Sequence, residues 1–437
     1  MTNDSMHARI FYGWFVVAAA FAVTFVGFGS AYTFGAFVPS LQTEFSASRG
    51  SVSLVFSLAG FLYFGLGVLS GPLSDRWGSR ALTVAGMTLV GLGLALAGMA
   101  RSLTEVYIAY ALGVGLGVGL SYVPVLSTIQ RWFVRRRGFA SGVAVSGIGV
   151  GTLVMPPFSA LLVESIGWRD AYFVLGGLAV VIGAGMALLI VNNPRDRGVA
   201  PDGAPIQAGA QFETPKGFAV ATAVKSPRFI GLYVACLLCS FGVFVPFAHV
   251  VPYAVDLGVA PAQAVYLLAM IGFGSTAGRF LLGGFADRYG RRFSLLVMFA
   301  GMAFAMMIWL IATEFWSLFI FALAYGVFYG GWVAVLPALV MDYFGEAKVG
   351  SLIGILYTSV AFGTLVGPSA AGYVFDLNQS YTTPILASVC ANLVAMLIAA
   401  GSSRVSLQPS ATSDLAEPSA TPKTAMTSPG LQPRGKG

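Results

Sequence analysis

One arginine stands alone within an apolar stretch of the chain. Arg279 lies in the apolar run 265–285, and the Asp and Glu residues fall near the ends of such runs or between them. Arginine stays protonated at working pH, so it is a permanent cation, and its forked donors match a carboxylate. We therefore predict that Arg279 anchors an anionic ligand. The alternative is a structural role, in which it pairs with a backbone carbonyl or an acid at a helix end.

A histidine and four tyrosines are the other polar side chains that could contact such a ligand. His249 lies in the segment FVPFAHVVPY (residues 244–253), where Pro246 and Pro252 interrupt helical hydrogen bonding and can expose backbone to a cavity. A buried histidine is either held by hydrogen bonds or lines a pathway and titrates near neutral pH, and both interpretations stay open. The candidate tyrosines, some of which packing alone could explain, are Tyr32, Tyr122, Tyr329 and Tyr357.

The remaining motifs do not indicate catalysis. Cys236 and Cys239 form a C-x-x-C within an apolar run that has no nearby His or acidic partner, so we assign them to packing. The run GVGLGVG (residues 113–119) follows no strand, which favours close helix packing over nucleotide binding. No run carries a Ser–His–Asp set or a set of metal ligands. We predict that the protein is not an enzyme and holds neither metal nor cofactor.

The elements that must position these residues are membrane-spanning helices. Hydrophobic residues make up 57% of the 437 residues and charged residues 9%, far below the roughly 25% of soluble domains. Apolar runs of about 18 or more residues indicate transmembrane helices. The sequence predicts an all-α membrane protein whose twelve helices span residues 11–38, 52–73, 81–99, 106–129, 139–163, 171–191, 229–255, 265–285, 293–312, 316–341, 351–374 and 384–400.

These helices divide into two six-helix halves, at residues 11–191 and 228–401, joined by a polar linker at 192–227. The N-terminus (1–10) and a Ser-, Thr- and Pro-rich, disordered tail (402–437) flank them. If residue 1 is cytoplasmic, the cytoplasmic segments hold 20 of the 24 Lys and Arg residues, which predicts both termini on the cytoplasmic side of the inner membrane. The basic cluster 135–137 fits the same rule, so we predict the lipid bilayer, and not nucleic acid, as its partner.

A duplicated motif relates the two halves. GPLSDRWGSR (residues 71–80) and GGFADRYGRR (283–292) match at an offset of 212, and GTLVMP (151–156) matches GTLVGP (363–368) at the same offset. The glycine of each loop allows a tight turn, and the charged pair can bridge neighbouring helix ends. We therefore predict gating roles for Asp75, Arg76, Asp287 and Arg288; a simple cluster of topogenic charges is the alternative.

The duplicated loop G-x-[LF]-x-D-R-x-G-x-R resembles the signature of the major facilitator superfamily. The segments YGW (12–14), YTFGAF (32–37) and GRFLLGGFADR (278–288) resemble its monocarboxylate transporter group, including bacterial members and the oxalate/formate exchanger. The resemblance implies a central site between the halves, rocking alternating access, a carboxylate on Arg279 and proton symport. Ser275 replaces the Asp that animal members use in proton coupling, and residues 351–374 lack the second cation of the oxalate exchanger.

These observations predict a secondary transporter for a small monocarboxylate such as lactate or pyruvate. Protons are the expected coupling ion. The alternatives within transport are an organic-anion exchanger and a carrier of larger or aromatic carboxylates. A membrane sensor with a transporter fold is a more distant alternative.

Overall fold

The computed structural model describes residues 11–203, 217–345 and 348–402. The predicted N-terminal segment 1–10, linker residues 204–216 and tail residues 403–437 lie outside this part of the chain. Apart from a single bridge between Gly217 and Gly345, every regular element in the described residues is helical. The predicted all-α class is confirmed.

The helices of residues 13–191, called the first half, are α1 (Gly13–Tyr32), α2 (Val38–Phe45), α3 (Arg49–Gly65), α4 (Gly67–Trp77), α5 (Ser79–Met99), α6 (Leu103–Tyr110), α7 (Leu116–Trp132), α8 (Arg137–Leu178) and α9 (Gly185–Ala187). After α10 (Val220–Val224), the second half contains α11 (Pro227–Val243), α12 (Val245–Asp256), α13 (Pro261–Tyr289), α14 (Arg291–Ile311), α15 (Phe315–Phe344), α16 (Val349–Asn378) and α17 (Thr382–Ser402).

Within the described residues, ten helical stretches are long and apolar enough to cross a membrane, and the pair α3 and α4, bent by 42°, makes an eleventh. One stretch, 138–187, is far longer than a bilayer requires. It contains Gly167, whose φ of 83° and ψ of 161° are not helical. The predicted spans 139–163 and 171–191 lie on either side of this glycine. Because Gly167 turns the chain back, the long stretch corresponds to two spans.

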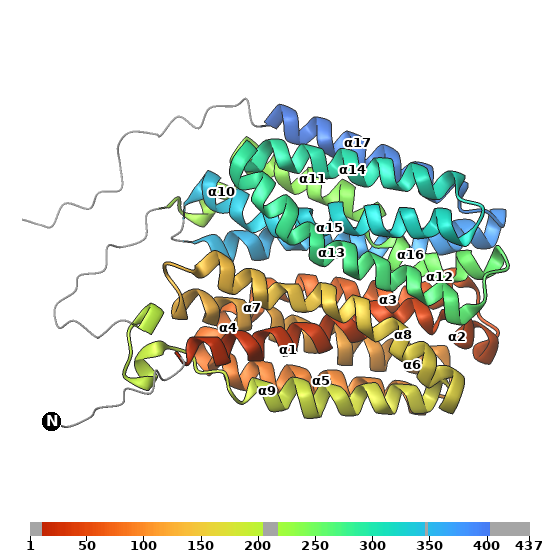
Figure 1. The fold of residues 1–437 in the computed structure, drawn as a ribbon, viewed down its shortest axis with the longest axis horizontal. Coiled ribbons are helices and arrows are strands. Elements are labelled where there is room, and N and C mark those ends of the chain that lie inside the picture. The colour runs from red at the N-terminus through yellow and green to blue at the C-terminus, as the bar shows by residue number, and fades with distance from the viewer. Residues whose placement is uncertain (1–10, 204–216, 346–347, 403–437) are drawn as a thin grey trace, which may run out of the picture. The chain divides into compact units, whose positions relative to one another are not determined.

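The two halves lie side by side with their helices roughly parallel. In Figure 1 the first half, red to yellow, forms the lower layer and the second half, green to blue, the upper one. The main contacts between the halves join α3 to α16 and α8 to α13. The helices that break mid-span also meet at this boundary: a Cβ on Gly35, in the 3₁₀ turn Thr33–Ala36, would lie 2.5 Å from the carbonyl oxygen of Phe247 in α12.

The glycines of the two signature loops adopt the same conformation. Gly78 ends α4 with a φ of 85°, and Gly290 ends α13 with a φ of 93°. Both φ angles lie in a region that residues other than glycine rarely adopt. The structure therefore supports the tight turns that the repeated motif predicts.

Backbone-to-backbone packing joins α13 to α15 in the second half. A Cβ added to Gly278 would overlap the carbonyl oxygen of Val327, and one added to Gly330 would overlap that of Ser275. Small residues spaced by four let transmembrane helices approach closely. Two such pairs face each other here: Gly274 with Gly278, and Gly326 with Gly330.

We predict that Gly278→Ala destabilises the protein by about 1–3 kcal/mol, because the new methyl group meets backbone that cannot move aside. Gly284→Ala on the same helix is the matched control, since a Cβ there has no neighbour within 4 Å. Alanine favours helix over glycine, so the control should keep or raise stability. Thermal unfolding of the purified proteins measures both changes, and an equal response of the two variants would contradict the assignment.

Candidate functional site

Arg279 lies on α13 at the boundary between the halves. Its side chain is 6% exposed, and none of its three guanidinium nitrogens has a hydrogen-bond partner among the described residues. A buried charge without a partner is strongly disfavoured. The four predicted tyrosines, Tyr329, Tyr122, Tyr32 and Tyr357, lie within electrostatic range of it, and none of their hydroxyls is hydrogen-bonded to it.

A glycine of the first half makes room for the guanidinium. Gly149 on α8 faces α13, and a Cβ at this position would lie 2.9 Å from Nη1 of Arg279. The same Cβ would overlap Oγ1 of Thr276, one turn earlier on α13. The Arg279 site is therefore formed jointly by the halves, with the charge from the second and the open space from the first.

The four tyrosines line a narrow cavity next to Arg279. Its volume is about 20 Å³, room for roughly one water molecule. Arg279 is not itself a lining residue, so an anion can reach it only when the cavity widens. None of the lining residues is charged, and they come from both halves: Phe28, Tyr32, Phe64, Tyr122, Ile148, Tyr329, Trp332, Val333, Leu336, Tyr357 and Val360.

A tyrosine pair closes the cavity between the halves. The hydroxyls of Tyr32 and Tyr329 lie 3.2 Å apart and are buried. The ring of Phe247, which comes from the broken helix α12, packs against both, with centroid distances of 4.6 Å and 5.3 Å. The contacts of Tyr32 with Tyr329 and with Phe247 span the boundary, so they have to separate when the halves move apart at this level.

Sequence reasoning missed several lining residues, of which Trp332 is the most informative. Its Nε1 is buried and has no hydrogen-bond partner in the described part of the chain. Trp332 lies three residues after Tyr329, a spacing that puts both on one face of α15, and their ring centroids are 6.3 Å apart. That spacing was the available signal. Phe28 and Phe64 had none, because they look like ordinary core aromatics.

His249 does not line this cavity. It is fully buried on α12, with Nε2 2.8 Å from the carbonyl oxygen of Pro368 and Nδ1 2.9 Å from the hydroxyl of Tyr381. A carbonyl oxygen only accepts, so Nε2 carries a proton. Ser53 of the first half lies 3.3 Å from the same nitrogen. The structure thus gives His249 the hydrogen bonds of the first interpretation, and a role in the pathway stays a prediction.

The predicted gating residues lie at the helix ends near the linker. Arg76, Asp287 and Arg288 are exposed, and the side chain of Asp75 lies outside the described part of the structure. Asp287 lies 3.8 Å from Arg291, whose guanidinium also binds Asp342 at the end of α15. These contacts connect helices within the second half. Gating by the four residues stays a prediction.

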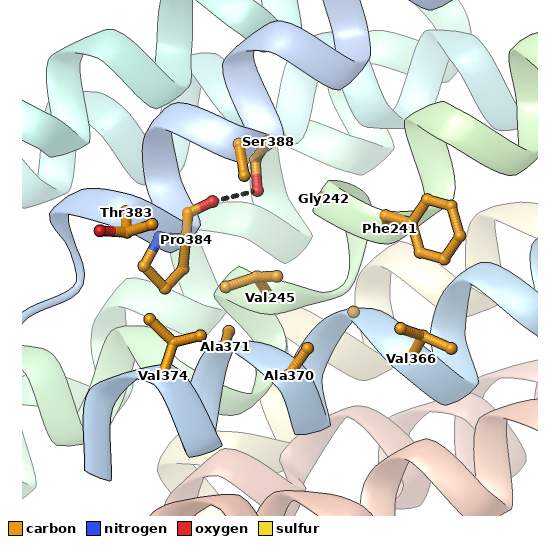
Figure 2. Close-up of a pocket in the computed structure, with 12 residues that line it drawn as sticks. Phe241, Gly242, Val245, Val366, Ala370, Ala371, Val374, Thr383, Pro384 and Ser388 are labelled. Carbon is orange, nitrogen blue, oxygen red and sulfur yellow. Dashed lines mark hydrogen bonds between the residues drawn. The ribbon is translucent and has the colours of Figure 1, made fainter. Parts of the chain in front are cut away.

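A larger pocket lies elsewhere, between α11, α12, α16 and α17 (Figure 2). Its volume is about 250 Å³, and its polar side chains are Thr383 and Ser388. The Ser388 hydroxyl already donates to the carbonyl oxygen of Pro384. A carboxylate would find no charged partner among these lining residues, so we place the candidate site at Arg279.

The sequence profile of the Major Facilitator Superfamily matches residues 19–311 and 230–429. The chain is 30% identical to monocarboxylate transporter 3 of Rattus norvegicus over 376 residues, which cover 85% of this chain and 75% of that protein. The chain belongs to the monocarboxylate transporter group of the major facilitator superfamily. It is also 28% identical to monocarboxylate transporter 11 of Homo sapiens over 388 residues, covering 86% of this chain and 80% of the relative.

The fold has a counterpart among solved structures. A bacterial homologue of the human lysosomal transporter Spinster, solved in an inward-facing and unoccupied conformation, matches with a TM-score of 0.68 and 15% identity. The match covers 90% of this chain and 97% of that one. Because the chain belongs to this transporter family, the protein is a multi-pass membrane transporter and not an enzyme, as its sequence predicts.

We predict that Arg279→Leu makes the empty protein more stable. Burying a charge without partners is costly, and an apolar side chain of similar reach removes that cost, typically by about 1–4 kcal/mol. The unfolding midpoint of purified Arg279→Leu protein should therefore rise, whereas Arg279→Lys, which keeps a buried cation, should not gain stability. A midpoint below that of the parent protein would mean that Arg279 has a structural partner.

Proposed function

We propose that the protein carries a small organic monocarboxylate, such as lactate or pyruvate, across the membrane. The observation that carries this proposal is the buried guanidinium of Arg279, which has no partner of its own among the described residues. A carboxylate would supply the missing charge and two acceptors for the forked donors. The names of the relatives, which are monocarboxylate transporters, support the same substrate class.

A single carboxylate fits better than two. The lining residues of the cavity are aromatic or aliphatic, and the Tyr hydroxyls and the Trp332 indole are their polar groups. A second carboxylate would be buried without a cation, which is costly. The predicted span 351–374 contains no Lys or Arg, which leads to the same conclusion.

Alternating access follows from how the site is divided. Arg279 belongs to the second half, and Gly149, Tyr32 and Tyr122 belong to the first. A bound carboxylate contacts both halves, so it favours the arrangement in which they close around it. We propose that the signature-loop residues Asp75, Arg76, Asp287 and Arg288 control the cytoplasmic side, and that both termini are cytoplasmic in the inner membrane.

Proton symport is the proposed coupling. Ser275 stands where animal members of the group have an Asp, so the proton would travel on His249 or on the carboxyl group of the substrate itself. Free exchange of organic anions is the alternative, and counterflow against preloaded substrate separates the two.

A second candidate, a carrier of larger or aromatic carboxylates, is favoured by the cavity walls. Phe28, Phe64 and Trp332 surround the space next to the tyrosines, and flat apolar groups stack well on such rings. Comparing uptake of phenylpyruvate with uptake of pyruvate distinguishes the two substrate sizes.

In proteoliposomes we expect saturable uptake of labelled lactate or pyruvate, increased by an inward proton gradient. Arg279→Ala should lower kcat/KM at least about thirtyfold, because losing one partner of a buried charge pair costs about 2–5 kcal/mol. Arg169→Ala is the charge-matched control, since Arg169 lies far along the chain and pairs with Glu44 instead. Saturable uptake by Arg279→Ala would contradict the role of Arg279.

Trp332→Phe tests the orphaned indole. If its N–H donates to a 2-oxo or 2-hydroxy oxygen, the variant should raise KM for pyruvate about fivefold, in line with one net hydrogen bond of about 1 kcal/mol. KM for propionate, which lacks that oxygen, should stay the same. Equal changes for both substrates would indicate a packing role for Trp332.

A further inference from the structure

A charged cluster joins the two halves at the end of the bundle opposite α10. We call this the distal end; it lies on the right in Figure 1, where α3 begins and α12 and α16 end. Arg49, the first residue of α3, extends both terminal nitrogens to the carboxylate of Asp256 at the end of α12, at 2.5 Å and 2.6 Å. Arg49 belongs to the first half and Asp256 to the second, so this bidentate pair crosses the boundary.

A second carboxylate of the same half binds the start of the same helix. Asp376, near the end of α16, accepts hydrogen bonds from the backbone N–H groups of Arg49 and Gly50, at 3.0 Å and 2.9 Å. These N–H groups have no partner within a helix, and a helix N-terminus favours a negative charge. The Arg49 guanidinium also lies 4.2 Å from the ring centroid of Phe375. Two elements of the second half thus hold one helix end of the first.

The backbones beneath the charges are in direct contact. A Cβ added to Gly372 on α16 would lie 2.7 Å from the Cα of Gly50 on α3. No solute can pass between the helices at this point while the contact holds. Separation of the halves at the distal end therefore requires that Arg49 leave both Asp256 and Asp376.

A second set of contacts between the halves lies one turn further along α3, at Ser53. Tyr381 connects this set to Arg49. The hydroxyl of Tyr381 accepts from Nη1 of Arg49 at 3.3 Å and also bonds to Nδ1 of His249. His249 in turn lies against Ser53 of α3. When Arg49 moves away, Tyr381 loses one of its partners, and the contact between Ser53 and His249 lies on the same opening boundary.

The burial of these charges suits a contact that breaks repeatedly. The side chains of Arg49 and Asp256 are 13% and 40% exposed. The Asp256 carboxylate is open to water and Arg49 is only partly buried, so the desolvation penalty of this pair is smaller than that of a deeply buried one. Such a pair is therefore easier to separate than a fully buried one.

We propose that Arg49, Asp256 and Asp376 form a gate that keeps the distal end closed and must open before the cavity can be reached from that side. The proposal rests on the proposed function, because a gate of this kind belongs to a carrier that alternates its access. None of these three residues belongs to the signature loops, so the gate is additional to the one predicted from the repeat.

The test measures access to Ser53, which is fully buried behind the gate. Ser53→Cys is introduced into a chain in which Cys236, Cys239 and Cys390 are replaced by Ala. A membrane-impermeant maleimide is then added to vesicles from the distal side, without substrate. We expect Arg49→Gln and Asp256→Asn each to raise the labelling rate about tenfold, and Arg49→Lys to have a smaller effect because it keeps the charge but not the fork.

Arg169→Gln is the matched control. Arg169 binds Glu44 at 2.7 Å near the same end, but both residues belong to the first half. It should leave labelling of Ser53→Cys unchanged. The proposal is overturned if Arg49→Gln and Asp256→Asn label at the parent rate, or if Arg169→Gln increases the rate equally.

Two further features keep the result decisive. Asp256→Asn and Asp376→Asn each remove the negative charge and one acceptor oxygen of a partner while Arg49 is kept, so one variant that fails to fold does not end the test. Size-exclusion profiles identify such variants. Because labelling needs no substrate, the gate can be confirmed even if carboxylate uptake is not found. Conversely, uptake that depends on Arg279 together with unchanged labelling would reject the gate alone.

Discussion

The structure accommodates a charge that is kept away from water and has no counter-ion among the described residues. A guanidinium in a low-dielectric interior is tolerated only if the fold around it is stable enough to hold it there. Glycine-mediated packing of α13 on α15 supplies that rigidity on one side, and Gly149 of α8 leaves the space on the other. The four Tyr hydroxyls are polar groups within electrostatic range of this charge, but none of them is hydrogen-bonded to the guanidinium.

Much of this could be predicted from the sequence, because the membrane makes hydropathy and isolated charges informative. The all-helical class, and the choice of Arg279 as the candidate anchor, follow from one rule, that polar groups in spans are expensive. The contacts of His249 and Arg49 could not be predicted in the same way. His249 meets Pro368 and Tyr381, and Arg49 meets Asp256, far along the chain, and no local pattern encodes such pairing. Trp332 was missed because an unpartnered indole looks like a packed one in sequence.

The two halves share a turn design but have diverged in what they contribute. Gly78 and Gly290 occupy equivalent positions and have nearly the same φ, whereas the position equivalent to Arg279, at the offset of 212, is Gly67. Gly67 begins α4, at the 42° bend that follows α3. At these equivalent positions the second half therefore has a charged side chain, and the first half has a bend in its backbone. The halves thus differ there both in side chain and in backbone shape.

The narrow cavity has a consequence for the leakage of ions and protons across the membrane when no substrate is bound. Space for about one water molecule is too little for a continuous column of solvent, and without such a column small ions cannot slip through and protons cannot hop from molecule to molecule. In this conformation the cavity beside Arg279 therefore offers no solvent-filled path for ions. A closed state of this kind preserves the electrochemical gradients across the membrane that contains it.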